Sequence, residues 1–261
     1  MSFTVHQNPE YLTSSVISVP HCFSTRHGGV SEGYLSSLNL GIHRGDVRAN
    51  VEKNYEILGE AVGFDPATLV FTHQTHTDIV AQVGKSDCGD GLVREVTVER
   101  DGLITNEKDV TLIVFSADCT PILLHDPVCH AIGAVHSGWR GTAAGIVKKA
   151  VEKMTRDFGT DPQDIEAAIG PCIGRCCFET HNDVPDAMLD ALGDAAMCAI
   201  TDDGNGKFHV DLKELNRIWL QKVGVTKIDV SGDCTACQPD RFWSHRKVGN
   251  ARGSLAAIIR L

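Results

Sequence analysis

A lone cysteine and a lone histidine flank a short apolar segment in the stretch SADCTPILLHDPVCHAIGAVHSGWR. Two apolar runs lie on either side of Asp126 and Pro127, a pattern typical of a β-hairpin. If the turn is centred between Pro127 and Val128, Cys119 lies directly opposite His136. Opposed residues in an antiparallel pair share one face, with β-carbons about 4.5 to 5.5 Å apart. The hairpin therefore predicts two neighbouring ligands of one zinc ion.

A third ligand must come from another segment, because zinc sites usually draw at least three protein ligands. The stretch HQTHTDIV offers His73 and His76, and spacing alone leaves both open. Two histidines and one cysteine leave a coordination position free, which is the arrangement of a catalytic zinc that supplies hydroxide near neutral pH. Cys119 and His136 in contact would equally form the dyad of a cysteine hydrolase, with the thiol as nucleophile and the imidazole as base.

Two glycine-containing loops offer positive charge for such a site. Arg26 lies in STRHGGVSEG, and Arg140 lies in HSGWRGT, which leads into a helix N-terminus. Cations and backbone N–H groups of this kind bind anions such as phosphate. Asp118 is the carboxylate nearest to Cys119 in the sequence and is a candidate catalytic proton shuttle, although neighbouring strand residues point to opposite faces. We therefore take Arg26 and Arg140 as candidate phosphate or substrate ligands.

Helical and strand patterns are interleaved along the chain that must position these residues. Apolar residues recur every three to four positions in segments 48–64 (after a possible cap at Asp46), 142–159, 210–224 and, more weakly, 182–193, which predicts helices. Short apolar runs predict strands within residues 16–24, 101–106, 110–116, 165–174, 225–232 and 253–261, besides the hairpin. The stretch 68–83 predicts a strand, a polar interruption and a second strand. Because helices alternate with strands and a hairpin also occurs, we expect a mixed α/β fold rather than a purely parallel sheet.

Composition excludes several classes of protein. The 261 residues include 24 Lys and Arg against 34 Asp and Glu, a net charge of −10, whereas a general nucleic-acid binder needs a basic face. No run of about 18 apolar residues and no basic start before an apolar segment occur, so we expect a soluble cytoplasmic protein with no membrane partner. The ten cysteines then predict reduced thiols, some of them on metal.

Several longer blocks resemble the signature blocks of a known family. These blocks are FSTRHGGVS, SLNLG, HQTH, SADCTPILL, AVHSGWRGT, IGPCIGRCCFE and CTACQPDRFWSHR. They resemble the YfiH family, also called the laccase-domain or multicopper polyphenol oxidase family, and they occur in order from about residue 22 to 258. The resemblance implies one YfiH-like domain over residues 1–261, with α/β/β/α layers. It also implies the metal ligands His76, Cys119 and His136, and so prefers His76 over His73.

The resemblance implies a zinc-dependent purine nucleoside enzyme. Its members phosphorolyse adenosine, inosine and methylthioadenosine to the base and a sugar 1-phosphate, and they deaminate adenosine to inosine. The bacterial branch is associated with peptidoglycan editing. A purine nucleoside and phosphate are therefore the expected partners, zinc is the expected cofactor, and copper can occupy a zinc site.

Two further functions remain as alternatives. Copper-dependent laccase chemistry would need many histidines, typically in His-x-His pairs, and no such pair occurs in the chain. A non-enzymatic zinc-binding module would need a site closed by four protein ligands. Cysteines that could supply a separate site of this kind are Cys172, Cys176, Cys177, Cys234 and Cys237.

Overall fold

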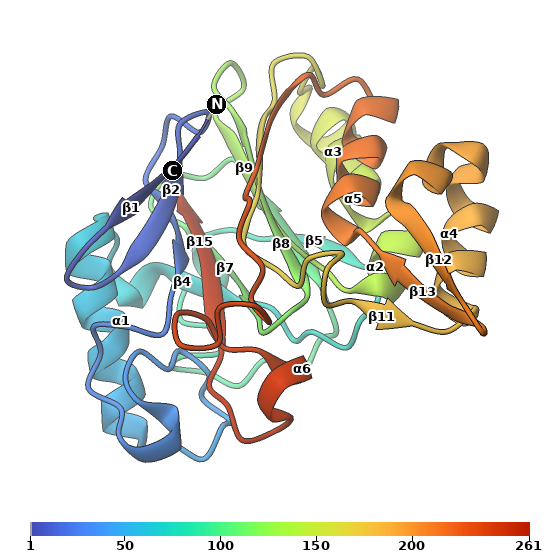
Figure 1. Ribbon diagram of the computed structural model, residues 1–261. Helices are drawn as coiled ribbons and strands as arrows, with labels where there is room; N and C mark the ends of the chain where they lie inside the picture. The colour runs from blue at the N-terminus through green and yellow to red at the C-terminus, as the bar shows by residue number, and fades with distance from the viewer. Residues whose placement is uncertain (1) are drawn as a thin grey trace.

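Two six-stranded mixed sheets pack against each other at the centre of the computed structural model, which describes residues 2–261 (Figure 1). The first sheet has the order β1-β2-β3-β15-β7-β4, and only β4 runs parallel to its neighbour. Its strands are β1 Phe3–His6, β2 Tyr11–Ser14, β3 His21–Ser24, β4 Leu69–Phe71, β7 Thr111–Ser116 and β15 Leu255–Arg260.

The second sheet has the order β14-β10-β8-β9-β6-β5 and carries the predicted hairpin at its centre. The two outer pairs, β14 with β10 and β6 with β5, are parallel, and the pairs between them are antiparallel. Its strands are β5 Val80–Gln82, β6 Gly102–Thr105, β8 Thr120–Asp126, β9 Ala131–Ser137, β10 Glu166–Ile169 and β14 Lys227–Val230.

Alternation along the strands divides the core into layers. In β7, Leu112 and Val114 belong to the cluster between the two sheets, whereas Ile113 belongs to the cluster under helix α1. Helix α1 (Arg48–Val62) buries Val51 and Tyr55 against that outer face. Side chains alternate along the strand every two residues and return to the same face of the helix every 3.6 residues, so Ile113 lies in one cluster with Val51 and Tyr55.

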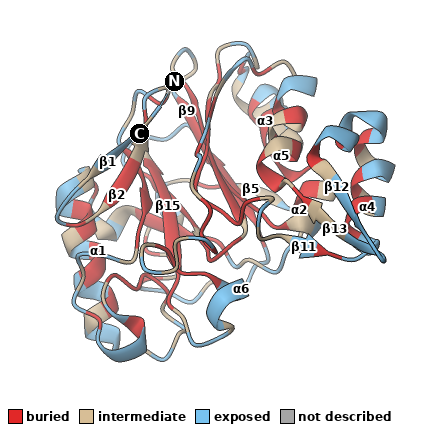
Figure 2. Ribbon diagram, viewed as in Figure 1, coloured by how far each residue is buried: buried red, intermediate tan, exposed pale blue. Residues whose placement is uncertain are grey.

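The second sheet is covered in the same way on its outer face. Leu123 of β8 faces the other sheet, and Leu124 faces α3 (Ile146–Phe158) and α5 (Leu212–Lys222). The central strands of both sheets are buried almost throughout, whereas the strands β1, β5 and β14 at the sheet edges are partly exposed and the helices expose one face (Figure 2). The predicted mixed α/β fold with α/β/β/α layers is confirmed.

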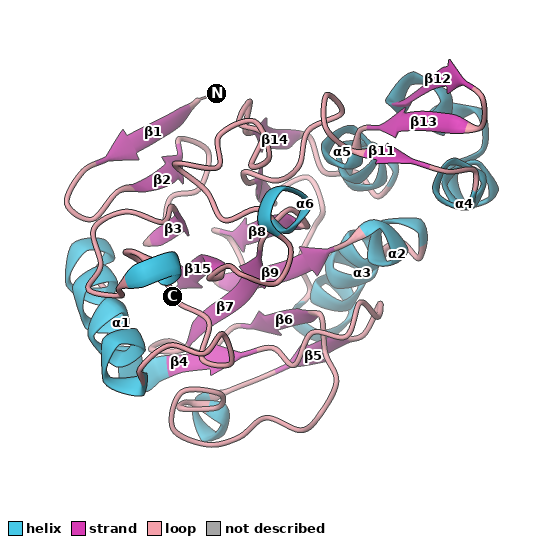
Figure 3. Ribbon diagram, turned by 60° about the horizontal axis from the view of Figure 1, so that its bottom comes forward, coloured by secondary structure: helices cyan, strands magenta, loops and turns pink. Residues whose placement is uncertain are grey.

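A third, small sheet lies beyond α5, and the sequence patterns did not predict it (Figure 3). It has the order β11-β13-β12, with β11 Glu179–Thr180, β12 Ile200–Gly204 and β13 Lys207–Val210. Helix α4 (Asp183–Leu192) and the 3-10 helix Gly193–Ala199 share a buried cluster with it, to which Trp139 and Ala143 of α2 (Trp139–Ala143) also contribute.

The remaining regular segments are short. They are α6 (His245–Val248) and the 3-10 helices Gly33–Leu35, Pro66–Thr68 and Lys85–Asp87. No helix within residues 2–261 combines the length and the apolar character that crossing a bilayer requires.

The helix predicted over residues 142–159 is divided in two. Gly145 adopts a left-handed conformation (φ 69°) between α2 and α3, which glycine tolerates because it has no Cβ. Helix α2 begins three residues earlier than predicted, at Trp139. The end of β9 therefore leads almost directly into a helix.

The predicted cap at Asp46 is wrong. Val47 occupies the N-cap position of α1 and makes no side-chain cap. The Asp46 carboxylate instead accepts hydrogen bonds from the Ser31 hydroxyl and the Asn39 amide. It therefore fixes the glycine-rich loop that contains Ser31.

The predicted hairpin register is also wrong. Pro121, not Cys119, lies opposite His136, and Asp126 pairs with Ala131. The turn holds four residues, because the Asp126 carboxylate accepts the N–H groups of Val128 and Cys129. Continued outward by one residue, this register sets Cys119 opposite Gly138 and diagonal to His136. The observed register differs from the predicted one by two residues. Because side chains alternate between faces with a period of two, Cys119 and His136 still lie on the same face of the sheet.

Candidate metal centre

His76, Cys119 and His136 lie together, although they come from three separate segments. Their potential ligand atoms all lie within 4.8 Å of one another. The Cys119 Sγ is 3.8 Å from the His76 Nε2, and the two imidazole rings meet edge to face with centroids 5.1 Å apart. His76 lies in the loop between β4 and β5, Cys119 just before β8, and His136 near the end of β9. We call these three residues the metal triad.

The structure separates the two histidines that spacing left open. The His73 Nδ1 is 2.9 Å from the Val96 carbonyl oxygen, and the backbone of His73 bridges to Glu99 and Arg100. His76 adopts a left-handed conformation (φ 64°), which non-glycine residues rarely adopt. Of the two, only His76 belongs to the triad.

Asp101 joins two members of the triad, and the sequence did not single it out. Its fully buried carboxylate lies 2.7 Å from the His136 Nδ1 and accepts the backbone N–H of His76 at 3.1 Å. It also accepts the N–H groups of Thr75 and Thr77 and the Thr77 hydroxyl. A carboxylate on Nδ1 fixes the tautomer that leaves Nε2 for a metal. One side chain therefore orients His136 and shapes the loop of His76.

Charge interactions within the triad stabilise the Cys119 thiolate, while His136 holds a proton that a metal ion would displace. Burial alone would raise the pKa of the Cys119 thiol, but His136 and His76 lower that pKa below its ordinary value. Burial alone would lower the pKa of His136, but Cys119 and Asp101 raise it. Despite burial, the hydrogen bond from His136 lowers the pKa of Asp101 to about 2. Asp101 is therefore ionised at neutral pH, and Cys119 is predisposed to the thiolate form that binds metals.

The donor set fits the metal that the resemblance implies. One thiolate and two imidazoles suit zinc or copper, and the Asp101–His136 pair is the carboxylate–histidine arrangement common at zinc sites. The three side chains would hold the ion with a coordination position left for substrate or water.

Gly138 is the position where a side chain would most directly disturb the triad. A Cβ there would lie 2.8 Å from the His76 Cδ2 and 3.3 Å from the Cys119 Sγ. Its φ of −68° is open to any residue, so the effect of Gly138→Ala is steric rather than conformational. We expect zinc affinity to fall by about tenfold or more, as for loss of a group that orients a ligand. Competition with a chromophoric chelator measures it.

Gly133→Ala in β9, the strand that leads to Gly138, is the matched control. A Cβ at Gly133 meets Leu124 and Ile104 at 3.4 to 3.5 Å, which is ordinary contact. Equal zinc affinity in the Gly138 variant and this control would contradict the prediction, because it would show that a methyl group at residue 138 does not displace His76.

Asp118 makes its contacts away from the triad. One carboxylate oxygen accepts the Thr235 hydroxyl, and the other accepts the Arg246 N–H, each at 2.6 Å. Its backbone is left-handed (φ 100°), and its carbonyl accepts the Ile173 N–H. These contacts favour a positioning role for Asp118, holding the turn that presents Cys119, over the predicted proton transfer.

Arg26 is engaged by backbone carbonyl groups. Its guanidinium donates to the Ser36 and Pro239 carbonyl oxygens and stacks on the Trp243 ring, 3.7 Å from the centroid. The side chain therefore joins two loops. Arg140 is exposed in the first turn of α2 and lies over the Trp139 ring at 4.2 Å. Of the two predicted phosphate ligands, Arg140 has the more accessible guanidinium.

Arg252 lies near Cys119 and Asp118, and Arg44 lies near Arg252; sequence patterns gave no reason to select either arginine. Burial and the neighbouring Arg44 lower the pKa of the Arg252 guanidinium to about 10, against the opposing influence of Asp118 and Cys119. Among residues 2–261 the buried Arg252 Nε has no hydrogen-bond partner. Arg44 donates to the Ser254 hydroxyl at 3.2 Å. Two neighbouring cations with free donor capacity favour an anion here.

Comparison with known proteins supports the resemblance drawn from the motifs. A family model described as "Multi-copper polyphenol oxidoreductase laccase" matches residues 20–261. The chain is 38% identical over 241 residues to "Purine nucleoside phosphorylase YlmD" of Bacillus subtilis, covering 91% of this chain and 86% of that protein. It is 34% identical over 252 residues to "Purine nucleoside phosphorylase" of Bacteroides thetaiotaomicron, covering 95% and 93%.

Solved structures share the fold over the whole chain. The crystal structure of YlmD from Geobacillus stearothermophilus matches with a TM-score of 0.93 at 35% identity, covering 99% of this chain and 98% of that one. The crystal structure of the Bacillus licheniformis protein YfiH matches with a TM-score of 0.93 at 33% identity, covering 98% of each chain.

Proposed function

We propose, from the premise that this chain belongs to the multi-copper polyphenol oxidoreductase laccase family, that it is a zinc-dependent purine nucleoside phosphorylase. The observation that carries the proposal is the open His76–Cys119–His136 triad, with the Arg252 guanidinium, whose buried Nε has no hydrogen-bond partner within residues 2–261, close enough to Cys119 to sense its charge. Relatives at 38% and 34% identity bear the name purine nucleoside phosphorylase, which supports the same reaction class here.

Phosphorolysis needs a phosphate oxygen to form a bond to the ribose C1′ while the bond from C1′ to the purine nitrogen breaks. The base leaves with that electron pair and takes up a proton. We propose that Arg252, with Arg44 and the exposed Arg140, holds the phosphate. Such charge-assisted hydrogen bonds position an anion and stabilise charge in the transition state. A zinc ion, when bound by the triad, supplies Lewis-acid polarisation of a substrate atom.

Within this proposal the protein groups divide into holding and positioning roles. Cys119, His136 and His76 would hold the ion, while Asp101 fixes the orientation of His136. Asp118 would position the turn before β8. Adenosine, inosine and methylthioadenosine are the proposed substrates, and deamination of adenosine is a proposed second activity of the same open site.

The direct test is to incubate the purified protein with adenosine, with and without phosphate, and to follow the products by chromatography. We expect adenine and ribose 1-phosphate only when phosphate is present, whereas the second activity would give inosine in both cases. Absence of turnover in a zinc-loaded preparation would contradict the proposal.

Replacement of Arg252 by methionine tests the phosphate site. Loss of a charged hydrogen-bond donor costs about 1.5 to 3 kcal/mol, so we expect the KM for phosphate to rise by about 10- to 100-fold while zinc content stays unchanged. Arg156→Met on the exposed face of α3 is the control, since Arg156 pairs with the neighbouring Asp157 and its side chain is 66% exposed. An unchanged phosphate KM in the Arg252 variant would assign the phosphate to other residues.

A cysteine hydrolase is the second candidate, and one observation favours it. The Cys119 thiol lies near the His136 imidazole, which in turn contacts the Asp101 carboxylate, so the three could act as nucleophile, base and orienting group. His136 and His76 also lower the pKa of the Cys119 thiol. His76 distinguishes the two functions, because a dyad does not need it. A protein that is active without metal and tolerates His76→Ala would favour the hydrolase.

Laccase chemistry and a purely structural zinc are less well supported. Within residues 2–261 the grouped histidine and cysteine donors form one three-ligand and one four-cysteine set, whereas multicopper oxidases need histidines for several coppers. Three protein ligands also leave the triad open, unlike a structural site. A single domain over residues 1–261, a cytoplasmic location and a role in peptidoglycan editing stay predictions.

A further inference from the structure

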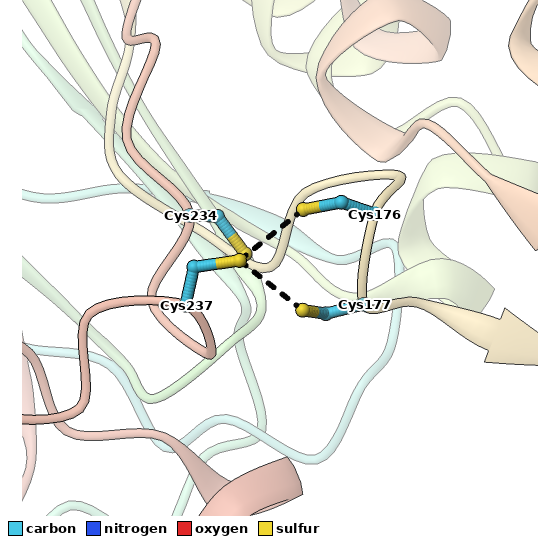
Figure 4. A group of neighbouring side chains, drawn as sticks. All are labelled: Cys176, Cys177, Cys234 and Cys237. Atoms are coloured by element: carbon cyan, nitrogen blue, oxygen red, sulfur yellow. Dashed lines mark hydrogen bonds between the residues drawn. The ribbon is translucent and has the colours of Figure 1, made fainter.

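Four cysteines outside the metal triad turn their sulfur atoms toward one another. They are Cys176, Cys177, Cys234 and Cys237 (Figure 4). All four Sγ atoms lie within 4.8 Å of one another, and the Cys237 Sγ is 3.4 Å from both the Cys176 and the Cys177 Sγ. We call these residues the four-cysteine cluster. None of the mechanistic steps above uses it.

Two facing turns build the cluster from segments about 60 residues apart. In the first turn the Cys177 N–H donates to the Gly174 carbonyl, and in the second the Cys237 N–H donates to the Cys234 carbonyl. The turns are joined where the Thr235 N–H donates to the Cys172 carbonyl at 3.0 Å.

Both turns therefore direct their cysteines into the same space. The Gly174 N–H also donates to the Cys234 Sγ at 3.1 Å, a contact that stabilises a thiolate.

The sulfur separations match a shared ion better than a disulfide. A disulfide needs an S–S distance near 2.05 Å, and all four thiols are free. Four thiolates around one zinc at about 2.3 Å lie about 3.8 Å from one another in a tetrahedron. The observed 3.4 Å separations are close to this value. Only small side-chain movements would bring the four atoms to one ion.

We propose that the four-cysteine cluster is a second metal site, a closed tetrathiolate site for zinc. Four protein ligands leave no coordination position for substrate, and structural zinc sites have this arrangement. Cys176 and Cys237 are exposed, so the site is open to metal loading from solvent. Cys172 lies near but takes no part, because its buried thiol donates to the Ile173 carbonyl.

The site would stabilise the turn that carries Cys119. Thr235, next to Cys234, donates its hydroxyl to Asp118, and the Ile173 N–H donates to the Asp118 carbonyl. Asp118 directly precedes Cys119. A zinc ion that joins the two loops would therefore hold the surroundings of Asp118 from both sides. The proposal itself does not depend on the reaction that the triad carries out.

Counting zinc by mass spectrometry in variants purified under reducing conditions tests the proposal. We expect about two equivalents per chain in the unaltered protein, one in Cys237→Ser, one in Cys119→Ser and none in the double variant, since loss of one ligand empties a structural site. Cys198→Ser is the matched control, because Cys198 is exposed and lies outside both donor sets. It should retain two equivalents.

A second measurement separates metal loss from misfolding. Cobalt(II) in a four-thiolate site gives intense charge-transfer absorption, which should persist in Cys119→Ser and disappear in Cys237→Ser. Retention of the single triad ion in Cys237→Ser shows that this variant is folded. Equal zinc content in Cys237→Ser and the unaltered protein would overturn the proposal. So would iron in place of zinc at the cluster, or a disulfide from Cys237 to Cys176 or Cys177 in non-reducing peptide maps.

Discussion

Replacement of His76 by alanine is expected to remove the zinc proposed for the triad and to abolish the proposed nucleoside phosphorolysis. His76 contributes a ligand atom within 4.8 Å of those of Cys119 and His136, and two remaining ligands rarely hold zinc. Metal ions supply several kcal/mol of transition-state stabilisation, so kcat/KM should fall by about a hundredfold to ten-thousandfold. Zinc content and phosphate-dependent adenine release, measured on the same preparation, check the result.

His73→Ala is the matched control for this prediction. His73 lies three residues earlier in the same loop, but its Nδ1 contacts the Val96 carbonyl rather than the triad. It should keep both zinc and activity. A His76 variant that lost the triad zinc yet retained full activity would separate the metal from the reaction and favour the Cys119–His136 dyad.

Replacement of Asp101 by asparagine is expected to weaken zinc binding without removing a ligand. The amide keeps one acceptor oxygen but turns its NH2 group toward one set of donors, either the His136 Nδ1 and the His76 N–H or the N–H groups of Thr75 and Thr77. Groups that orient metal ligands are worth about 10- to 100-fold in affinity. A buried N–H donor without an acceptor should also lower the free energy of unfolding by about 1 to 3 kcal/mol. Chelator competition and denaturant unfolding measure the two effects.

Asp126→Asn provides the comparison for the Asp101 variant. Asp126 is also a fully buried aspartate, and its carboxylate accepts the N–H groups of Val128 and Cys129 in the hairpin turn, at the far end of β8 from Cys119. This variant should lose stability but keep its zinc affinity. If both variants weakened zinc binding equally, general destabilisation rather than the orientation of His136 would explain the result.

Local patterns in the sequence were sufficient to predict most of the regular structure. Apolar residues at helical spacing predicted α1, α3, α4 and α5, and short apolar runs predicted most strands of the two large sheets. The helix predictions hold because each helix buries one face, which repeats apolar residues every three to four positions. The strand predictions hold because the central strands are buried on both faces and therefore appear as short continuous apolar runs. The small third sheet escaped prediction because its strands are short and mostly exposed, as the exposed run of β12 illustrates.

The sequence by itself also provided the residue types and motifs of the triad, because donor chemistry does not depend on the fold. Spacing left His73 and His76 open, the motif resemblance preferred His76, and the tertiary structure showed that His73 contacts Val96 instead. Only the tertiary structure corrected the hairpin register and showed that Asp101 contacts the triad and that Arg252 lies near Cys119. It likewise brought together cysteines about 60 residues apart. These are long-range contacts, set by how sheets and loops pack, and such contacts leave no periodic signal in the local sequence.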